Sequence, residues 1–155
     1  MVWRLNDDPW LFPDPHQGEP DGLLAVGGDL SPDRLLAAYS FGIFPWYGFR
    51  ESPEIMWWCP MDRFVIFPSE VHVSHSMRQL IRSNRYTVSI GSDFNGVIEQ
   101  CSLANRRNEQ PGAWLGDEMK EAYKRLHVLG YATSFEVRDA DSRLVGGLYG
   151  VGIGR

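Results

Sequence analysis

The sequence contains only two cysteines, Cys59 and Cys101, among its 155 residues. Two thiols form neither a disulfide framework nor the paired spacing of a zinc site, so we expect both to be buried. No apolar run approaches the ~20 residues that a membrane-spanning helix requires, so no membrane partner is expected. The first ten residues, MVWRLNDDPW, lack the basic and then apolar segments of a secretory signal. The sequence therefore predicts a cytoplasmic protein.

Positive charge is also scarce, because 15 Lys and Arg face 20 Asp and Glu, for a net charge of -5. This balance excludes a protein whose whole surface binds nucleic acid, although a basic stripe on an acidic body remains compatible with it. The apolar share of 43% is typical of a soluble globular protein. A chain of this length can bury one core with a small additional domain.

Residues 1–62 are rich in turns and predict a small N-terminal domain. The stretch FPDPHQGEPDG holds three prolines and two glycines, too many for regular structure. One helix is predicted after it, with Ser31 as the N-cap, Pro32 at the first helical position and Gly42 as the stop. A short extended piece follows over residues 53–63.

The sequence pattern changes at Arg63, and residues 63–155 predict a second domain of mixed helices and strands. Strands are expected at 63–68, 86–91, 132–139 and 144–154, and helices at 74–84, 93–104 and 117–130. The fold class is therefore α+β, with a partly antiparallel sheet in the second domain.

The stretch SFGIFPWYGF, residues 40–49, holds five aromatic side chains around a proline. We expect three of them to pack in the core: Phe41, Phe44 and Tyr47. Trp46 follows Pro45 in a predicted loop, and Trp114 stands in the predicted loop QPGAWLGD. Tryptophans in loops are suited to stacking on a flat ligand, so both are candidate stacking platforms.

Basic side chains recur on one face of the helix predicted at 74–84. They stand at i, i+3, i+7 and i+10: His75, Arg78, Arg82 and Arg85. The opposite face is apolar: Met77, Leu80 and Ile81. Two interpretations remain open, an ordinary solvated face of an amphipathic helix and a ridge that contacts phosphates.

Two further patterns are weak. His72 and His75 have a spacing seen in metal sites, but no carboxylate or cysteine completes a site, so no metal is predicted. GGLYGVGIG near the C-terminus lacks the GK[ST] of a phosphate-binding loop. Glycines within a strand indicate a bulge or a close backbone approach, and the residues leave both open.

Long motifs taken in chain order resemble the leucyl/phenylalanyl-tRNA–protein transferases from Phe12 onward. They are PDGLLAVGGDLSPDRLLAAYSFGIFPWY, WWCP, AYKRLHVLGYATSFEV and LVGGLYGVGIG. The resemblance implies transfer of Leu or Phe from aminoacyl-tRNA to the N-terminal Arg or Lys of acceptor proteins, which marks them for N-end-rule degradation. It also implies a GNAT-like acyltransferase fold for residues 63–155 and no cofactor.

The resemblance assigns roles to particular residues. Trp46 and Trp114 would lie around the 3'-terminal adenosine, and Gly147 and Leu148 would wall the pocket for the amino-acid side chain. The tRNA acceptor stem would contact the basic residues His75, Arg78, Arg82 and Arg85. Two rival functions remain open, a CoA-dependent acyltransferase and a non-catalytic module that binds RNA or peptide.

The sequence departs from the family pattern at several places. TWIT appears here as AWLG and WWSP as WWCP, and Gln79 and Ser83 stand where more charge is usual. The family continues past the equivalent of Arg155 through a GESMF-like segment and a segment with an Asp and a Gln proposed for catalysis. We therefore expect a truncated domain, with catalytic residues beyond Arg155. Residues 1–155 alone should be inactive, and the exposed edge of the last strand should make them poorly soluble.

Overall fold

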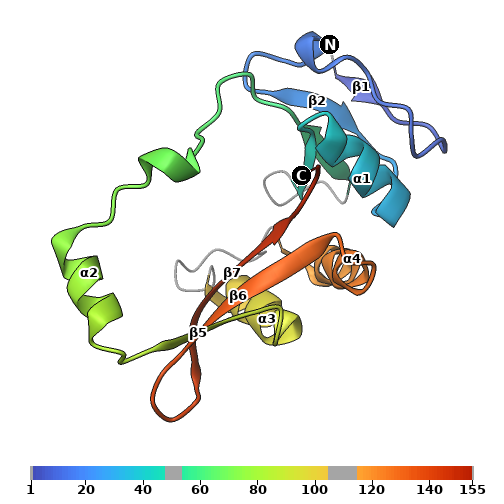
Figure 1. Cartoon of the computed structure of the whole chain (residues 1–155). Helices are drawn as coiled ribbons and strands as arrows, with labels where there is room; N and C mark the ends of the chain where they lie inside the picture. Colours follow the sequence, from blue (N-terminus) through green and yellow to red (C-terminus); the bar gives the residue numbers. More distant parts are fainter. Residues whose placement is uncertain (1, 48–53, 105–114, 155) are drawn as a thin grey trace.

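A computed structural model describes residues 2–47, 54–104 and 115–154 of the chain (Figure 1). Within these residues the chain forms two β-sheets and four α-helices. The predicted α+β fold class is confirmed. No described helix is long and apolar enough to cross a membrane.

The first sheet is built from residues 3–58 in the strand order β1-β2-β4-β3. Its strands are β1 (Trp3–Arg4), β2 (Leu23–Val26), β3 (Phe44–Tyr47) and β4 (Ile55–Trp58). β1 runs parallel to β2, and the other pairs are antiparallel. Only the extended piece around β4 was expected, because strands of two to four residues between prolines are too short to show an alternating pattern.

Helix α1 (Pro32–Ser40) packs against this sheet as the sequence predicts. The Ser31 side chain accepts a hydrogen bond from the Arg34 backbone N–H at 3.4 Å and so caps the first turn. The helix ends before Gly42, whose φ of +73° is a left-handed conformation that glycine adopts without strain. The predicted start and stop signals are both confirmed.

The second sheet is antiparallel and has the strand order β5-β6-β7. It consists of β5 (Thr87–Ile90), β6 (Ala132–Arg138) and β7 (Leu144–Val151). Helices α3 (Phe94–Ala104) and α4 (Asp117–Val128) contact the same face of this sheet (Figure 1). Along β6 the side chains alternate between buried and exposed, so the other face of the sheet lies open.

One hydrophobic core joins the two sheets. Buried residues of the first region contribute Leu24, Leu35, Ile43 and Trp57, and those of the second contribute Phe94, Ile98, Met119 and Leu126. A hydrogen bond of 2.5 Å between the hydroxyls of Tyr39 and Tyr123 also links α1 with the second region. The domain boundary near Arg63 stays a prediction.

The segment between the two sheets departs from expectation. Residues 63–68 were predicted as a strand, but they pair with no described strand, and Phe64 is fully exposed (103%). The prediction is wrong because an apolar run becomes a strand only where another strand offers hydrogen bonds. A short 3-10 helix (Pro68–Glu70) and helix α2 (His75–Arg82) follow, and the Ser74 side chain caps α2 by accepting a hydrogen bond from the Met77 backbone N–H at 3.3 Å.

Two packing predictions need correction. Phe41 is 59% exposed, because it caps the C-terminal end of α1 and its ring points away from the core. Phe44 is half-buried beneath the Arg63 guanidinium, 5.7 Å from its ring centroid, and the Tyr47 side chain lies outside the described part. Of the two thiols expected to be buried, Cys59 is buried and Cys101 only half-buried.

Candidate functional site

Trp46 lies on strand β3, at the edge of the first sheet, and not in the predicted loop. Its side chain is 46% exposed. The ring stands 6.5 Å from that of Trp58 with the planes tilted by 57°, and Trp58 Nε1 donates a hydrogen bond to the Trp46 carbonyl at 3.3 Å. A strand holds Trp46 more firmly than a loop does, and its exposed surface can accept a stacked base.

Gly147 and Leu148 are consecutive residues of β7 and face opposite sides of the second sheet. A Cβ atom at Gly147 would lie 2.9 Å from a methyl of Val97 on α3, so this glycine allows a close approach. Leu148 points to the open face and is 65% exposed. The close-approach interpretation of the glycines therefore holds at Gly147.

A buried carboxylate, Glu136 on β6, lies beneath this part of β7. Its register partner on β7 is Gly147. The carboxylate accepts hydrogen bonds from the hydroxyls of Ser134, Ser89 and Ser92 at 2.6, 2.6 and 2.8 Å, and from the Asp93 backbone N–H at 3.2 Å. Burial alone would raise the pKa of Glu136, but these donors outweigh it and lower the pKa to about 2. Glu136 is therefore ionised at neutral pH.

The Glu136 network fixes the corner between β5 and α3. Ser89 lies on β5, and Ser92 and Asp93 lead into α3. Asp93 also binds Arg138 at 2.6 Å and accepts the Gly96 N–H at 2.9 Å. Because α3 presses Val97 on Gly147, this network positions the strand that carries Leu148. Sequence reasoning missed Glu136, although ATSFEVR places it in the inward alternation of a strand.

Three tyrosines meet where the two sheets share their core. The Tyr123 ring contacts the Tyr149 ring at 5.4 Å, and its hydroxyl bonds that of Tyr39. Burial raises the pKa of Tyr123 and Tyr149, so both phenols are neutral at physiological pH. The buried Tyr149 hydroxyl has no hydrogen-bond partner within the described part of the chain. This group was also missed from sequence, because nothing in the sequence brings residues so far apart together.

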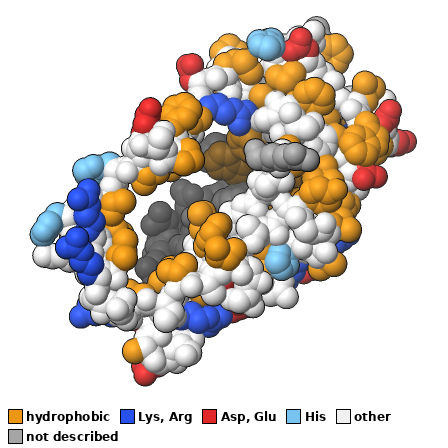
Figure 2. Space-filling view, in the orientation of Figure 1, with side chains coloured by type: hydrophobic (Ala, Val, Ile, Leu, Met, Phe, Trp, Pro, Cys, Tyr) orange, Lys and Arg blue, Asp and Glu red, His pale blue; other side chains and the backbone are white. Residues whose placement is uncertain are grey.

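The predicted basic stripe is only partly helical. His75, Arg78 and Arg82 lie on α2 and are exposed, but Arg85 follows the helix. Asn84, with φ of 48°, ends the helical path, so the placement of Arg85 on the same helical face is wrong. Within the described residues no carboxylate pairs with Arg78 or Arg82, and Arg78 Nε donates to the Val73 carbonyl at 3.0 Å. Figure 2 shows these basic side chains on the outer rim of the molecule.

The candidate residues belong to three separate places. Trp46 is on the first sheet, Gly147 and Leu148 are on the second, and α2 stands apart from both (Figure 1). Trp114 lies outside the described residues. Among the described residues, the structure groups Gly147 with Leu148 on β7 and His75 with Arg78 and Arg82 on α2, but it does not bring these places together.

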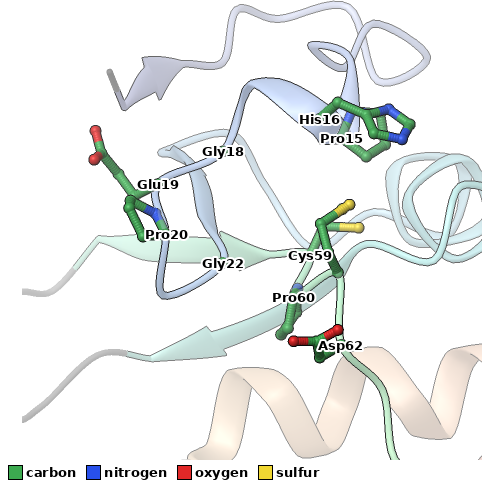
Figure 3. A pocket seen from close by; sticks show the side chains of 10 residues that line it. Pro15, His16, Gly18, Glu19, Pro20, Gly22, Cys59, Pro60 and Asp62 are labelled. Carbon is green, nitrogen blue, oxygen red and sulfur yellow. The ribbon is translucent and has the colours of Figure 1, made fainter.

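A pocket of about 250 Å³ opens on the first region (Figure 3). Its lining comes from the turn between Pro15 and Gly22 and from the residues after β4, including Cys59 and Asp62. The Cys59 sulfur lies 3.2 Å from an Arg63 guanidinium nitrogen. None of the sequence-predicted site residues lines this pocket.

Over residues 2–47, 54–104 and 115–154 no three His, Cys, Asp or Glu side chains form a group that could hold a metal ion.

Comparison with protein families gives two adjoining matches. Residues 65–155 match the family described as leucyl/phenylalanyl-tRNA protein transferase, and residues 28–61 match the N-terminal domain of the same family. Together the two matches cover most of the chain.

Curated relatives carry the same name. A leucyl/phenylalanyl-tRNA–protein transferase from an Anaeromyxobacter species (strain Fw109-5) is 52% identical over 143 residues, which are 92% of this chain and 59% of the relative. That of Anaeromyxobacter dehalogenans is 51% identical over 99% of this chain and 64% of its own length. That of Maridesulfovibrio salexigens is 48% identical over all of this chain and 63% of its own. The chain thus spans about three fifths of the length of these relatives.

Proposed function

The chain belongs to the leucyl/phenylalanyl-tRNA protein transferase family, and we propose that the intact gene product transfers Leu or Phe from aminoacyl-tRNA to acceptor proteins. The observation that carries the proposal is the family match over residues 28–61 and 65–155. Acceptors would begin with Arg or Lys, and the added residue would mark them for N-end-rule degradation. The reaction would take place in the cytoplasm.

The proposed chemistry is attack of the acceptor's N-terminal amine on the ester carbonyl that joins the amino acid to its tRNA. An amide bond forms, the ester C–O bond breaks, and the ribose hydroxyl of the tRNA 3' end leaves with the proton that the amine loses. A free α-amino group has a pKa of about 7.7–8.0, so roughly a tenth of it is neutral at pH 7 and no strong base is needed. Holding the amine and the ester carbonyl together, with donors for the developing oxyanion, supplies most of the acceleration. The protein's task is therefore mainly to bind and orient two substrates.

The exposed side chains suit this task. Trp46 offers an aromatic surface to the 3'-terminal adenosine, a role that Trp114 would share. Leu148, open to solvent on β7, would contact the transferred Leu or Phe side chain. Each methylene that an apolar pocket accepts or excludes is worth about 1–3 kcal/mol, so an apolar wall is enough to select large apolar amino acids.

The basic residues would contact the tRNA acceptor stem. His75, Arg78 and Arg82 project from α2, and Arg85 follows its end. Arginines without an acidic partner in the described part of the chain are ready to bind phosphates and release counterions. A local basic surface of this kind reconciles an RNA substrate with the net charge of -5.

A transfer assay with the intact gene product tests the proposal. The assay follows radiolabelled Leu from Leu-tRNA to two peptides that begin with Arg or Lys. The control peptides have the same sequence with an acetylated N-terminus, which removes the nucleophile. Transfer to the free peptides alone supports the proposal, and absence of transfer to any peptide contradicts it.

A binding measurement separates the enzyme from its main rival. A non-catalytic module would bind aminoacyl-tRNA or peptide without turnover. Binding of both substrates by the intact gene product with no labelled peptide would favour that module over the transferase.

A further inference from the structure

Two apolar surfaces of the chain lie exposed in the described residues. On the open face of the second sheet the side chains are Val88, Ile90, Phe135 and Leu148, and on one side of α2 they are Met77, Leu80 and Ile81. A soluble monomer rarely leaves apolar patches larger than a few hundred Å² in water. Both surfaces are therefore sites where further burial would stabilise the protein.

The sheet surface is continuous across its three strands. Ile90 on β5 pairs with Phe135 on β6, and Phe135 pairs with Leu148 on β7. These three side chains form a row on one face, because residues opposite each other in a sheet point the same way. Helices α3 and α4 occupy the other face. The row is thus a continuous apolar surface that spans the three strands.

We propose that α2 folds back onto this open face and covers β5 and β6, while Leu148 on the edge strand β7 stays uncovered. The apolar side of α2 would then lie on Val88, Ile90 and Phe135. The closure itself does not depend on the proposed function.

The dimensions and the connection suit this packing. Four residues, 83–86, separate the end of α2 from β5, a length usual for a helix that packs on the strand it precedes. The 8 residues of α2 make a helix of about 12 Å, close to the ~13 Å of the 4-residue strand β5. A helix about 10 Å wide covers two strands spaced by ~4.8 Å. A tether this short also gives α2 a far higher effective concentration than a free partner.

The orientation of α2 already favours closure. Figure 2 shows the apolar side chains of this segment toward the hollow between it and the rest of the molecule, and the basic ones on the outer rim. Folding α2 inward would bury the apolar side and leave His75, Arg78 and Arg82 in solvent. It would also place the basic side of α2 on the same side of the molecule as Leu148. That tRNA binds along this side rests on the proposed function.

Backbone hydrogen exchange of the intact gene product tests the closure without any substrate. An isolated helix of eight residues is only marginally stable, so the α2 amides should exchange almost freely if α2 stands apart. If α2 packs on the sheet, they should exchange about 100-fold more slowly. Phe135→Asp should remove this protection, whereas Val128→Asp, on the exposed end of α4, should leave it intact.

A second variant keeps the test decisive if Phe135→Asp prevents folding. Ile81→Asp lies on α2 itself, so it should abolish the protection of α2 while the amides of β6 remain protected. Free exchange of the α2 amides in the parent chain would overturn the proposal. Protection that rises with protein concentration, together with a dimer in light scattering, would also overturn it, because the cover would then be a second copy.

Discussion

The hydrophobic core that joins the two sheets and the segment from Arg63 to Tyr86 both contain large apolar residues. These residues are buried in the core and mostly exposed in the segment. Trp57 is completely buried, whereas Phe64, only seven positions later, is fully exposed. Both regions contain a helix with a serine cap, α1 and α2, so local signals act equally well in both. The difference lies in partners, because α1 packs on a sheet and α2 does not. Local sequence therefore specifies helices, and tertiary contacts decide which apolar residues are buried.

Replacing Trp57 should lower the free energy of unfolding more than any other substitution in these two regions. Trp57→Ala removes a fully buried ring that contacts Phe12 edge-on and a hydrogen bond of 2.8 Å from Nε1 to the Gly27 carbonyl. Deletions of this kind cost about 3–5 kcal/mol of unfolding free energy. Urea denaturation of the intact gene product measures the change.

Phe64→Ala is the matched control for that experiment. An exposed side chain contributes little, so we expect the unfolding free energy to change by less than ~0.5 kcal/mol. A cost for Phe64→Ala as large as that for Trp57→Ala would show that the exposed segment is packed in solution.

Changes at Glu136 should have the next largest effect on stability. Its side chain is a charged group buried in the well-packed part of the molecule, whereas the exposed segment, all of which the structure describes, has none. Its pKa is lowered from 4.5 to about 2 by its hydrogen-bond donors. Between these values the unfolded chain binds more protons than the folded one, so stability rises with pH. The stabilisation is complete above about pH 4.5 and is lost as the pH falls toward 2. Denaturation midpoints measured across this range should show the loss.

Glu136→Gln should flatten this pH dependence, because the amide does not titrate there. It should also cost about 1.5–3 kcal/mol at pH 7, since bonds to a charged acceptor are lost. A matched substitution, Glu121→Gln on the exposed side of α4, should keep the parent pH profile. An unchanged profile in the Glu136 variant would contradict the assigned pKa.

The sequence predicts the helices of this fold better than its strands. Ser31 and Ser74 mark the starts of α1 and α2, because a cap acts on neighbours in the chain. The apolar run at residues 63–68 looked like a strand and is not one, whereas the short strands β1, β2 and β3 were missed. Strand formation depends on distant partners, and a single sequence does not name them.

The sequence gives candidate site residues whose roles stay predictions, and it did not predict where the fold places them. Trp46 and Leu148 are both exposed, and their stacking and pocket roles stay predictions. Arg85 was placed on a helical face that ends before it. Glu136 and Tyr149 went unnoticed because buried polar groups depend on partners from other elements, Ser89 and Tyr123 among them.

Trp46 lies on a strand of the well-packed first sheet, and yet its side chain is exposed. Trp46→Ala should weaken binding of a stable aminoacyl-adenosine analogue by about 1–3 kcal/mol, because base stacking is lost. Titration calorimetry on the intact gene product measures the affinity. Trp46→Phe should lose much less, and Trp10→Ala, which removes an exposed tryptophan elsewhere, should lose nothing.

A thermal melt of the Trp46 variant completes that experiment. If Trp46→Ala unfolds at a much lower temperature while its affinity is kept, the ring acts in the core and the stacking role is wrong.

The smallest expected effect lies in the exposed segment, on the basic side of α2. Each arginine that contacts a phosphate releases a counterion, so Arg82→Ala should reduce the slope of log affinity against log salt for tRNA by about 0.7–0.9. Filter binding by the intact gene product between low and moderate salt measures this slope. Arg143→Ala is the control, because Arg143 already pairs with Asp139 and Asp141 in the turn before β7. If both variants keep the parent slope, α2 is a solvated helix and the tRNA contact lies elsewhere. If only Arg82→Ala reduces it, the segment that contributes least to the core contributes to RNA binding.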